Sequence, residues 1–281
     1  MSVEQAGTFA LGGDLPVNRL GFGAMRITGP GIWGEPPDEA EARRVLRRAV
    51  ELGVNLIDTA DSYGPDVSER LIGETLAPCP KGLVIATKGG LVRPGPDVWE
   101  RDCRPERLRR ACEGSLKRLK LERIDLYQLH APDPKVPLED QLGSLADLQR
   151  EGKIRHVGVS NFDVPQLEKA VGIVKVVSVQ NRYNLADRSS REVLEWCEAR
   201  GVGFIPWRPL GVEGLEDGPL ARIAERHRAT PAQIALAWLL ASSKVMLPIP
   251  GTGSVKHLEE NCAAAGIRLS DEEVRELRAL R

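Results

Sequence analysis

Four side chains suited to acid–base chemistry lie at or near the ends of short apolar runs. Asp58 ends the run VNLID, Lys88 ends LVIATK and His130 ends IDLYQLH. Tyr63 follows Asp58 by five residues, in the segment DTADSYG. A carboxylate, an ammonium, an imidazole and a phenol brought together are suited to proton transfer at a carbonyl group.

Each of these four side chains has a distinct expected role. Lys88 is expected to stabilise the phenolate and so to lower the pKa of Tyr63 below its ordinary value of about 10. Asp58 would balance the charge of Lys88 in a partly dry site. His130 can donate a hydrogen bond to the carbonyl oxygen and stabilise the charge that develops there. The sequence therefore predicts acid catalysis at a carbonyl, with Tyr63 as the proton donor.

The elements that must position these residues follow a regular rhythm. Short β-branched apolar runs alternate with amphipathic stretches, which is typical of βαβ units around a parallel sheet. The predicted strands cover residues 19–25, 54–58, 83–88, 124–130, 154–160, 176–180, 202–207 and 245–250. Eight strands favour a closed (β/α)8 TIM barrel, in which reacting groups lie at the carboxyl ends of the strands.

Turn residues and helix caps complete the expected architecture. The turn GGD at residues 12–14 separates two short extended pieces, which predicts an N-terminal β-hairpin that closes the bottom of the barrel. Helix starts are expected after Asp38, Thr230 and Ser270, the last two in capping boxes, and the first helix is expected to end at Leu52. No linker divides the chain, so residues 1–281 are expected to form a single domain.

The composition limits the function classes. The formal net charge is -1, which does not favour nucleic acid or a membrane surface as a partner. Five dispersed cysteines without a CxxC pair predict neither a disulfide framework nor a metal site, and they suit the cytoplasm. No basic segment precedes a long apolar run, so neither export nor membrane insertion is expected. The expected partner is a small carbonyl compound, and the protein is expected to be a monomer or a weak homo-oligomer.

Eight segments, in their order and spacing, resemble the aldo-keto reductase superfamily. They are GFGAMR, NLIDTADSYG, SERLIGETL, ATKGG, SLKRLKLERIDLYQLH, GKIRHVGVSNF, VQNRYNL and PIPGTGSVKHLEEN. The resemblance implies that Asp58, Tyr63, Lys88 and His130 form a catalytic tetrad. It also implies that hydride comes from a nicotinamide bound without a Rossmann fold, and no G-x-G-x-x-G motif occurs in the chain.

The resemblance further implies a cofactor site at the strand ends. Ser160, Asn161 and Gln180 would hold the nicotinamide carboxamide, and Trp207 would stack on the ring. Leu210 and Gly211 would approach the diphosphate through backbone N–H groups. The other residues implied are Gly23, Arg208, Gly251, the helix-start segment Thr252, Gly253 and Ser254, which favours a phosphate, His257, and Glu260 and Asn261 near the adenine.

Two departures from the family pattern bear on the cofactor. Many NADPH-specific relatives carry a lysine where this chain has Gly251 and an arginine where it has His257, and both cations are missing here. Lys256 is available nearby, so NADP(H) is favoured and NAD(H) is possible. Arg208 follows the stacking aromatic directly, where it can reach the diphosphate or an anionic substrate.

The substrate pocket has fewer signals. Trp33, in the loop TGPGIWGEPP, is the expected pocket wall, and the loops 91–102 and 211–218 are expected to contribute. The chain stops at Arg281, so a long carboxyl-terminal loop over the substrate is not expected.

Other readings of the same residues remain open at this point. Asp58 and Lys88 alone would suit a structural ion pair, and Tyr63 alone a half-buried loop aromatic. Lys88 could instead form a Schiff base with a carbonyl compound, as in class I aldolases. Some relatives are potassium-channel β subunits that bind NADPH as redox-sensing partners, and this is the alternative function.

Overall fold

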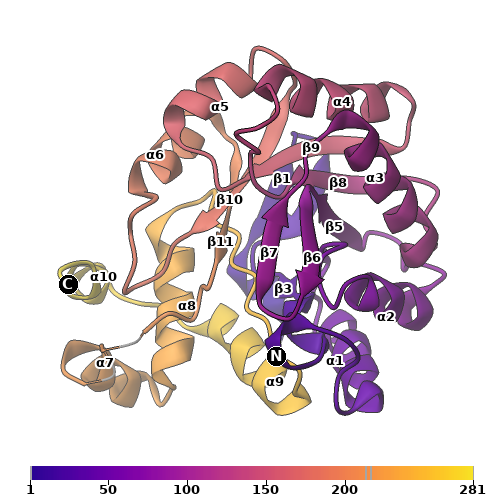
Figure 1. The fold of residues 1–281 in the computed structure, drawn as a ribbon. Helices are drawn as coiled ribbons and strands as arrows, with labels where there is room; N and C mark the ends of the chain where they lie inside the picture. Colours follow the sequence, from indigo (N-terminus) through magenta and orange to yellow (C-terminus); the bar gives the residue numbers. More distant parts are fainter. Residues whose placement is uncertain (1, 213, 216, 281) are drawn as a thin grey trace.

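The computed structural model describes residues 2–212, 214–215 and 217–280, in which parallel strands are surrounded by helices (Figure 1). Seven strands pair in the order β11-β10-β9-β8-β5-β4-β3. Their bounds are β3 Phe22–Gly23, β4 Leu56–Asp58, β5 Val84–Gly89, β8 Ile124–Leu129, β9 Ile154–Ser160, β10 Val176–Arg182 and β11 Gly203–Trp207. Helices cover the outside of the sheet and side chains fill its inside, so the strands are apolar on both faces.

The predicted last strand, residues 245–250, closes the ring between β11 and β3. Phe204 of β11 exchanges two backbone hydrogen bonds of 2.8 Å with this segment, and the Gly21 N–H donates to the Pro248 carbonyl at 3.0 Å. Pro248 and Pro250 have no N–H, so the segment pairs largely through its carbonyl groups. The prediction of a (β/α)8 barrel is therefore confirmed.

The helices follow their sequence signals closely. They are α1 Glu39–Glu51, α2 Val67–Leu76, α3 Pro105–Leu119, α4 Leu138–Arg150, α5 Val164–Ala170, α6 Arg191–Arg200, α7 Pro219–His227, α8 Pro231–Ser242, α9 Val255–Ala263 and α10 Asp271–Arg278. Asp38 caps α1, and the capping boxes at Thr230 and Ser270 are confirmed. Within the described part of the chain, no helix combines the length and the apolar character needed to cross a bilayer.

The predicted N-terminal hairpin closes the bottom of the barrel. It consists of β1 Thr8–Leu11 and β2 Leu15–Asn18. Leu11 and Val17 are fully buried and pack against inward-facing residues of the barrel strands, among them Leu56, Val84, Leu126, Val177, Ile205 and Leu247. The hairpin thus supplies the lowest layer of the barrel core.

A second hairpin lies at the opposite end and was predicted only as a loop. It directly follows β5 and consists of β6 Leu91–Gly95 and β7 Val98–Arg101 (Figure 1). Asp97 in its turn takes the left-handed conformation with a φ of 57°, which an aspartate tolerates better than most residues. Because β5 carries Lys88, this hairpin begins at the mouth of the barrel.

Candidate active site

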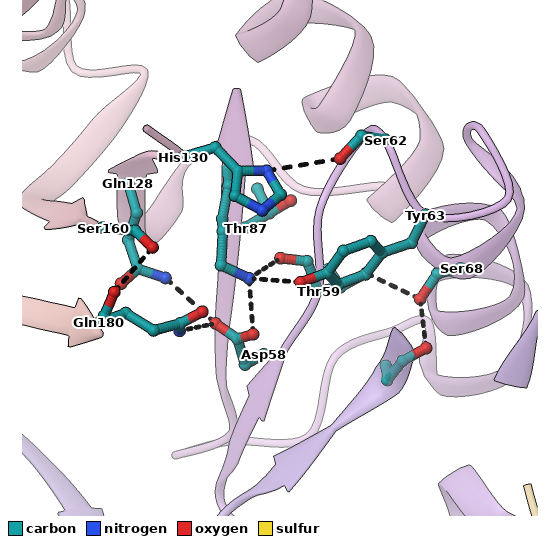
Figure 2. Close-up of polar contacts among 12 residues, drawn as sticks. Asp58, Thr59, Ser62, Tyr63, Ser68, Thr87, Gln128, His130, Ser160 and Gln180 are labelled. Carbon is teal, nitrogen blue, oxygen red and sulfur yellow. Dashed lines mark hydrogen bonds and ion pairs between the residues drawn. The ribbon is translucent and has the colours of Figure 1, made fainter. Parts of the chain in front are cut away.

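Lys88 is the centre of a buried polar group at the mouth of the barrel. It is fully buried, and its Nζ donates to Asp58 Oδ1 at 2.6 Å, to the Thr59 carbonyl at 2.8 Å and to Tyr63 Oη at 3.3 Å (Figure 2). Burial alone lowers the pKa of Lys88, but the neighbouring Asp58 and Tyr63 outweigh it and the net shift is upward. The side chain is therefore a fixed ammonium.

Asp58 is held from two further directions. Its Oδ2 accepts hydrogen bonds from Gln128 Nε2 at 3.1 Å and from Gln180 Nε2 at 2.9 Å (Figure 2). Gln180 was expected at the cofactor, whereas Gln128 was not identified from the sequence because it lies inside the apolar run that precedes His130. The carboxylate and the ammonium of Lys88 consequently form one fully hydrogen-bonded pair.

Tyr63 does not have the pKa that the sequence suggested. Burial is the largest influence and raises its pKa, Lys88 lowers it by less, and Asp58 and Asp61 raise it further. The expectation that Lys88 brings the pKa below its ordinary value is therefore wrong, because burial penalises the phenolate more than the ammonium stabilises it. The phenol stays protonated at neutral pH. Since Lys88 donates to Oη, the O–H of Tyr63 is left to donate to another acceptor.

His130 is a neutral imidazole beside this phenol. Its Nδ1 lies 3.4 Å from Ser62 Oγ (Figure 2), and its ring centroid lies 5.8 Å from that of Tyr63. Burial and, secondarily, the charge of Lys88 lower the pKa of His130 well below its ordinary value. In the tautomer in which Nδ1 accepts from Ser62, the neutral ring carries its proton on Nε2 and can donate a hydrogen bond to a carbonyl oxygen.

A cavity of about 240 Å³ opens beside Tyr63 and Asp58. The expected cofactor residues that line it are Gly23, Gln180, Trp207, Arg208, Leu210, Gly211 and Gly251. Met25, Arg26, Pro209 and Ile249 also line it and were not identified from the sequence. The wall combines the indole of Trp207, glycine backbone and two guanidinium groups, which suits a ligand with a flat ring and anionic groups.

Glycines make the close approach of two segments in this wall feasible. A Cβ on Gly23 would lie 2.7 Å from the Ile249 carbonyl oxygen, and a Cβ on Gly251 would lie 2.6 Å from the Gly23 carbonyl oxygen. Larger residues at either position would force β3 away from the closing segment, so the shape of the cavity depends on both glycines.

Ser160 and Asn161 form hydrogen bonds with three other residues of the site. Ser160 Oγ donates to the Gln180 carbonyl at 2.7 Å. Asn161 Nδ2 donates to the His130 carbonyl at 3.0 Å, and its Oδ1 accepts from Trp207 Nε1 at 3.1 Å. Asn161 adopts a φ of 61°, in the left-handed region that asparagine tolerates. In this structure both side chains therefore orient neighbouring site residues.

The expected phosphate segment precedes α9 as predicted, but an acidic residue reaches it. Thr252 Oγ1 accepts from the Ser254 N–H at 3.1 Å, while the Val255 N–H donates to Glu41 Oε1 at 2.9 Å. Glu41 comes from α1 and had no sequence signal. The remaining residues expected at the cofactor lie on α9, where His257 is exposed, Glu260 is half-buried and Asn261 is buried. Gly253 is exposed.

Two tryptophans, Trp33 and Trp99, lie near the mouth of the barrel, and only Trp33 was expected as a pocket wall. The backbone of Trp33 pairs with Gly64, and its ring centroid lies 5.7 Å from the guanidinium carbon of Arg93. The ring centroid of Trp99, on β7, lies 6.5 Å from that of Tyr63 and 6.4 Å from that of His130. The contribution of the loop 91–102 to a substrate pocket stays a prediction, since none of its residues lines the cavity beside Tyr63. In the loop 211–218, residues 213 and 216 lie outside the described residues, and Gly211 lines the cavity.

The described part of the chain was expected to hold no metal site. Across the described residues, no three or more His, Cys, Asp or Glu side chains are grouped so that they could hold a metal ion.

The sequence and the barrel fold agree with those of known proteins. Residues 19–281 match the aldo/keto reductase family. The chain belongs to this family. This aldo/keto reductase is 52% identical over 274 residues to an uncharacterised oxidoreductase of Schizosaccharomyces pombe, covering 97% of this chain and 89% of the relative. It is 41% identical to the pyridoxine 4-dehydrogenase of Escherichia coli, covering 94% and 95%.

A solved structure supports the fold and the family. The aldo-keto reductase of Klebsiella pneumoniae in complex with NADPH superposes with a TM-score of 0.82 at 27% identity, covering 96% of this chain and 93% of that one. Together these relatives place this aldo/keto reductase among oxidoreductases. The Schiff-base reading of Lys88 is not supported, because its Nζ has three acceptors and a raised pKa, whereas a nucleophilic lysine must lose its proton.

Proposed function

We propose that this protein reduces aldehydes and ketones to alcohols with NADPH, and that Tyr63 is the general acid. The observation that carries the proposal is the phenol of Tyr63, protonated and hydrogen-bonded to the ammonium of Lys88, at the edge of the cavity. His130 lies beside it as a neutral donor. A proton donor with an oxyanion-stabilising donor beside it is what reduction of a carbonyl requires.

The residues of the cavity fit a reduced nicotinamide dinucleotide, which supplies hydride when bound. Trp207 would stack on the ring, Gln180 and the neighbouring Ser160 and Asn161 would hold the carboxamide, and Arg208, Leu210 and Gly211 would face the diphosphate. Gly23, Gly251 and the segment 252–254 would hold the remaining parts, with His257, Glu260 and Asn261 on α9. The preference for NADPH over NADH is supported by the Klebsiella pneumoniae relative, which was solved with NADPH.

The residues of this chain divide the proton transfer among them. Tyr63 donates its O–H proton to the substrate oxygen as the negative charge develops there. Lys88 stabilises the phenolate that remains, and Asp58 keeps Lys88 in place. His130 donates a hydrogen bond to the same oxygen and orients it. Burial of all four groups strengthens these interactions because little water competes for them.

The substrate class proposed for a first test is an aldehyde on a flat ring. The Escherichia coli relative is named a pyridoxine 4-dehydrogenase. Oxidation of pyridoxine at its 4-position alcohol yields pyridoxal, so pyridoxal belongs in the first panel beside simple aldehydes, ketones and quinones.

All five cysteines are free, which supports a proposed cytoplasmic location. For the assembly, we propose a monomer or a weak homo-oligomer.

The test combines binding with turnover. Fluorescence titrations with NADPH and NADH give the two affinities, and the loss of reduced-nicotinamide absorbance with each carbonyl gives the activity. Tyr63→Phe is expected to bind NADPH as the native protein does and to lose about 10²- to 10⁴-fold in carbonyl reduction. Unchanged turnover in this variant would refute Tyr63 as the acid. Tight NADPH binding without reduction of any carbonyl would point instead to a redox-sensing subunit.

A further inference from the structure

The β6–β7 hairpin presents a large aromatic side chain where none is needed for folding. Trp99 is 37% exposed and, with Val98 and Val171, is one of three exposed large apolar residues in the described part of the chain. Its ring meets both Tyr63 and His130 edge to face, at 6.5 and 6.4 Å between centroids. An exposed indole that borders a catalytic pair is suited to contact a ligand.

Arg93 fixes the position of this indole. Its guanidinium carbon lies 3.8 Å from the ring centroid of Trp99, so one face of the indole is covered. The same guanidinium donates to the Val98 carbonyl at 2.9 Å and to the Ile32 and Gly31 carbonyls, each at 3.0 Å. Because Arg93 is itself buried, the hairpin is tied to the loop at residues 30–32 and Trp99 has one defined orientation.

The position of the reacting carbonyl follows from the proposed function, on which this inference rests. Its oxygen must reach both the Tyr63 O–H and the His130 ring, and the Trp99 ring lies within 6.5 Å of both of these rings, centroid to centroid. A carbonyl attached directly to an aromatic ring is conjugated and coplanar with it. The ring of such a substrate is therefore held close to the tryptophan when the oxygen is in place.

We infer that Trp99 is a specificity-determining residue that selects carbonyl compounds in which the carbonyl group is attached directly to a flat aromatic or heteroaromatic ring. Arg93 is the positioning residue that holds the indole. Aromatic pairs contribute beyond the area that they bury, so the preference over an aliphatic ring of similar size is about 3- to 10-fold. A puckered ring makes the same apolar contact without the aromatic contribution.

The experiment compares benzaldehyde with cyclohexanecarbaldehyde, which have equally many carbon atoms but a flat and a puckered ring. Trp99→Ala is expected to lower kcat/KM about 5- to 10-fold for benzaldehyde and less than about 2-fold for cyclohexanecarbaldehyde. Trp99→Phe is expected to keep most of the preference. Val98→Ala is the matched control, since Val98 is exposed on the same strand and alternate residues of a strand point to opposite faces.

Arg93→Lys separates positioning from direct contact. It is expected to raise KM for benzaldehyde while kcat stays near the native value, because the indole loses its orientation but the acid is untouched. In the double variant with Trp99→Ala, the change at Arg93 is expected to add nothing further. An additional loss in the double variant would refute the positioning role.

Each result separates this inference from the proposed function. Equal losses for both aldehydes in Trp99→Ala, or no loss for either, would overturn the selection of aromatic substrates while carbonyl reduction stands. A native protein that oxidises NADPH with neither aldehyde, nor with any of the wider panel, overturns the proposed function and this inference with it. NADPH affinity, measured by fluorescence, is expected to stay unchanged in all these variants.

Discussion

The barrel carries a β-hairpin at each end, and the two hairpins use apolar side chains in opposite ways. At the bottom, β1–β2 buries Leu11 and Val17 completely among the strands. At the mouth, β6–β7 leaves Val98 and Trp99 at 45% and 37% exposure. The bottom hairpin is therefore expected to raise the free energy of unfolding, whereas the upper one gives up burial and places an aromatic ring beside the proposed catalytic pair. Similar local structures thus serve stability at one end and recognition at the other.

The largest effect is expected from Lys88→Met, which tests how far a buried ion pair at the mouth serves both the chemistry and the stability. Carbonyl reduction is expected to fall about 10²- to 10⁴-fold, because the phenolate of Tyr63 loses its ammonium. The free energy of unfolding is also expected to fall by about 3 to 5 kcal/mol, since Asp58 is left buried without its cation. Steady-state kinetics and urea unfolding measure the two effects.

A double variant serves as the control for this prediction. Adding Asp58→Asn removes the buried charge and is expected to restore part of the stability but none of the activity. If activity returned together with stability, the ammonium would act on the fold and not on the chemistry.

Leu11→Ala tests the other side of the comparison. The loss of a fully buried leucine is expected to cost about 2 to 5 kcal/mol in urea unfolding, while kcat/KM stays native wherever the variant is folded. Thr8→Ala, an exposed position on the same strand, is the matched control and should change neither quantity. A variant that loses activity while its stability is unchanged would contradict the division between the two ends.

Asp61→Asn probes a stability effect at the mouth that depends on pH. Burial, with a smaller contribution from Glu69, raises the pKa of Asp61 from its ordinary value to about 8, and its Oδ1 has no hydrogen-bond partner among the described residues. The folded protein keeps a proton that the unfolded chain loses. The stability contributed by this proton is present below the unfolded pKa and is lost as the pH rises toward 8.

The asparagine variant cannot ionise, so its stability relative to the native protein is expected to increase by about 1.4 kcal/mol for each pH unit in this window. Urea unfolding at several pH values between about 5 and 8 measures the slope. Parallel pH dependences of the two proteins would show that Asp61 has an ordinary pKa.

Glu41→Gln is expected to have the smallest effect. It tests whether a phosphate of the cofactor binds at the N-terminus of α9. The Glu41 carboxylate accepts a hydrogen bond from the first residue of α9, where a phosphate is proposed to bind. Removing one negative charge at a helix N-terminus is expected to strengthen NADPH binding relative to NADH about 2- to 5-fold. Glu41 is also paired with Arg44, so Glu39→Gln, on the same helix and likewise paired with arginines (Arg43 and Arg70), is the control. Equal changes for both cofactors would contradict the assignment.

Local signals account for the parts that the sequence predicted. Asp58, Lys88 and His130 were recognised because a polar residue that ends an apolar run lies at the mouth of a barrel. The strands and capped helices were predictable for the same reason, since their periodicity and their caps lie within a few consecutive residues.

The features that the sequence missed depend on partners far away in the chain. Trp99 lies in a hairpin whose strand β7 is exposed throughout and so shows no apolar alternation. Glu41 meets Val255 only once α1 and α9 are packed together. The pKa of Tyr63 was misjudged because the sequence shows the neighbouring charge but not the depth of burial, and burial is the larger influence.

The seam at which the barrel closes also has a consequence for how the protein is made. Gly21 and Gly23 of the first strand region donate their N–H groups to the carbonyls of Pro248 and Pro250, at 3.0 and 3.3 Å. A chain that leaves the ribosome N-terminus first must therefore hold one edge of β3 without its partner until residues 245–250 have been synthesised. The ring of strands can close only after that segment has emerged, and until then that edge is open to wrong pairing or to a chaperone.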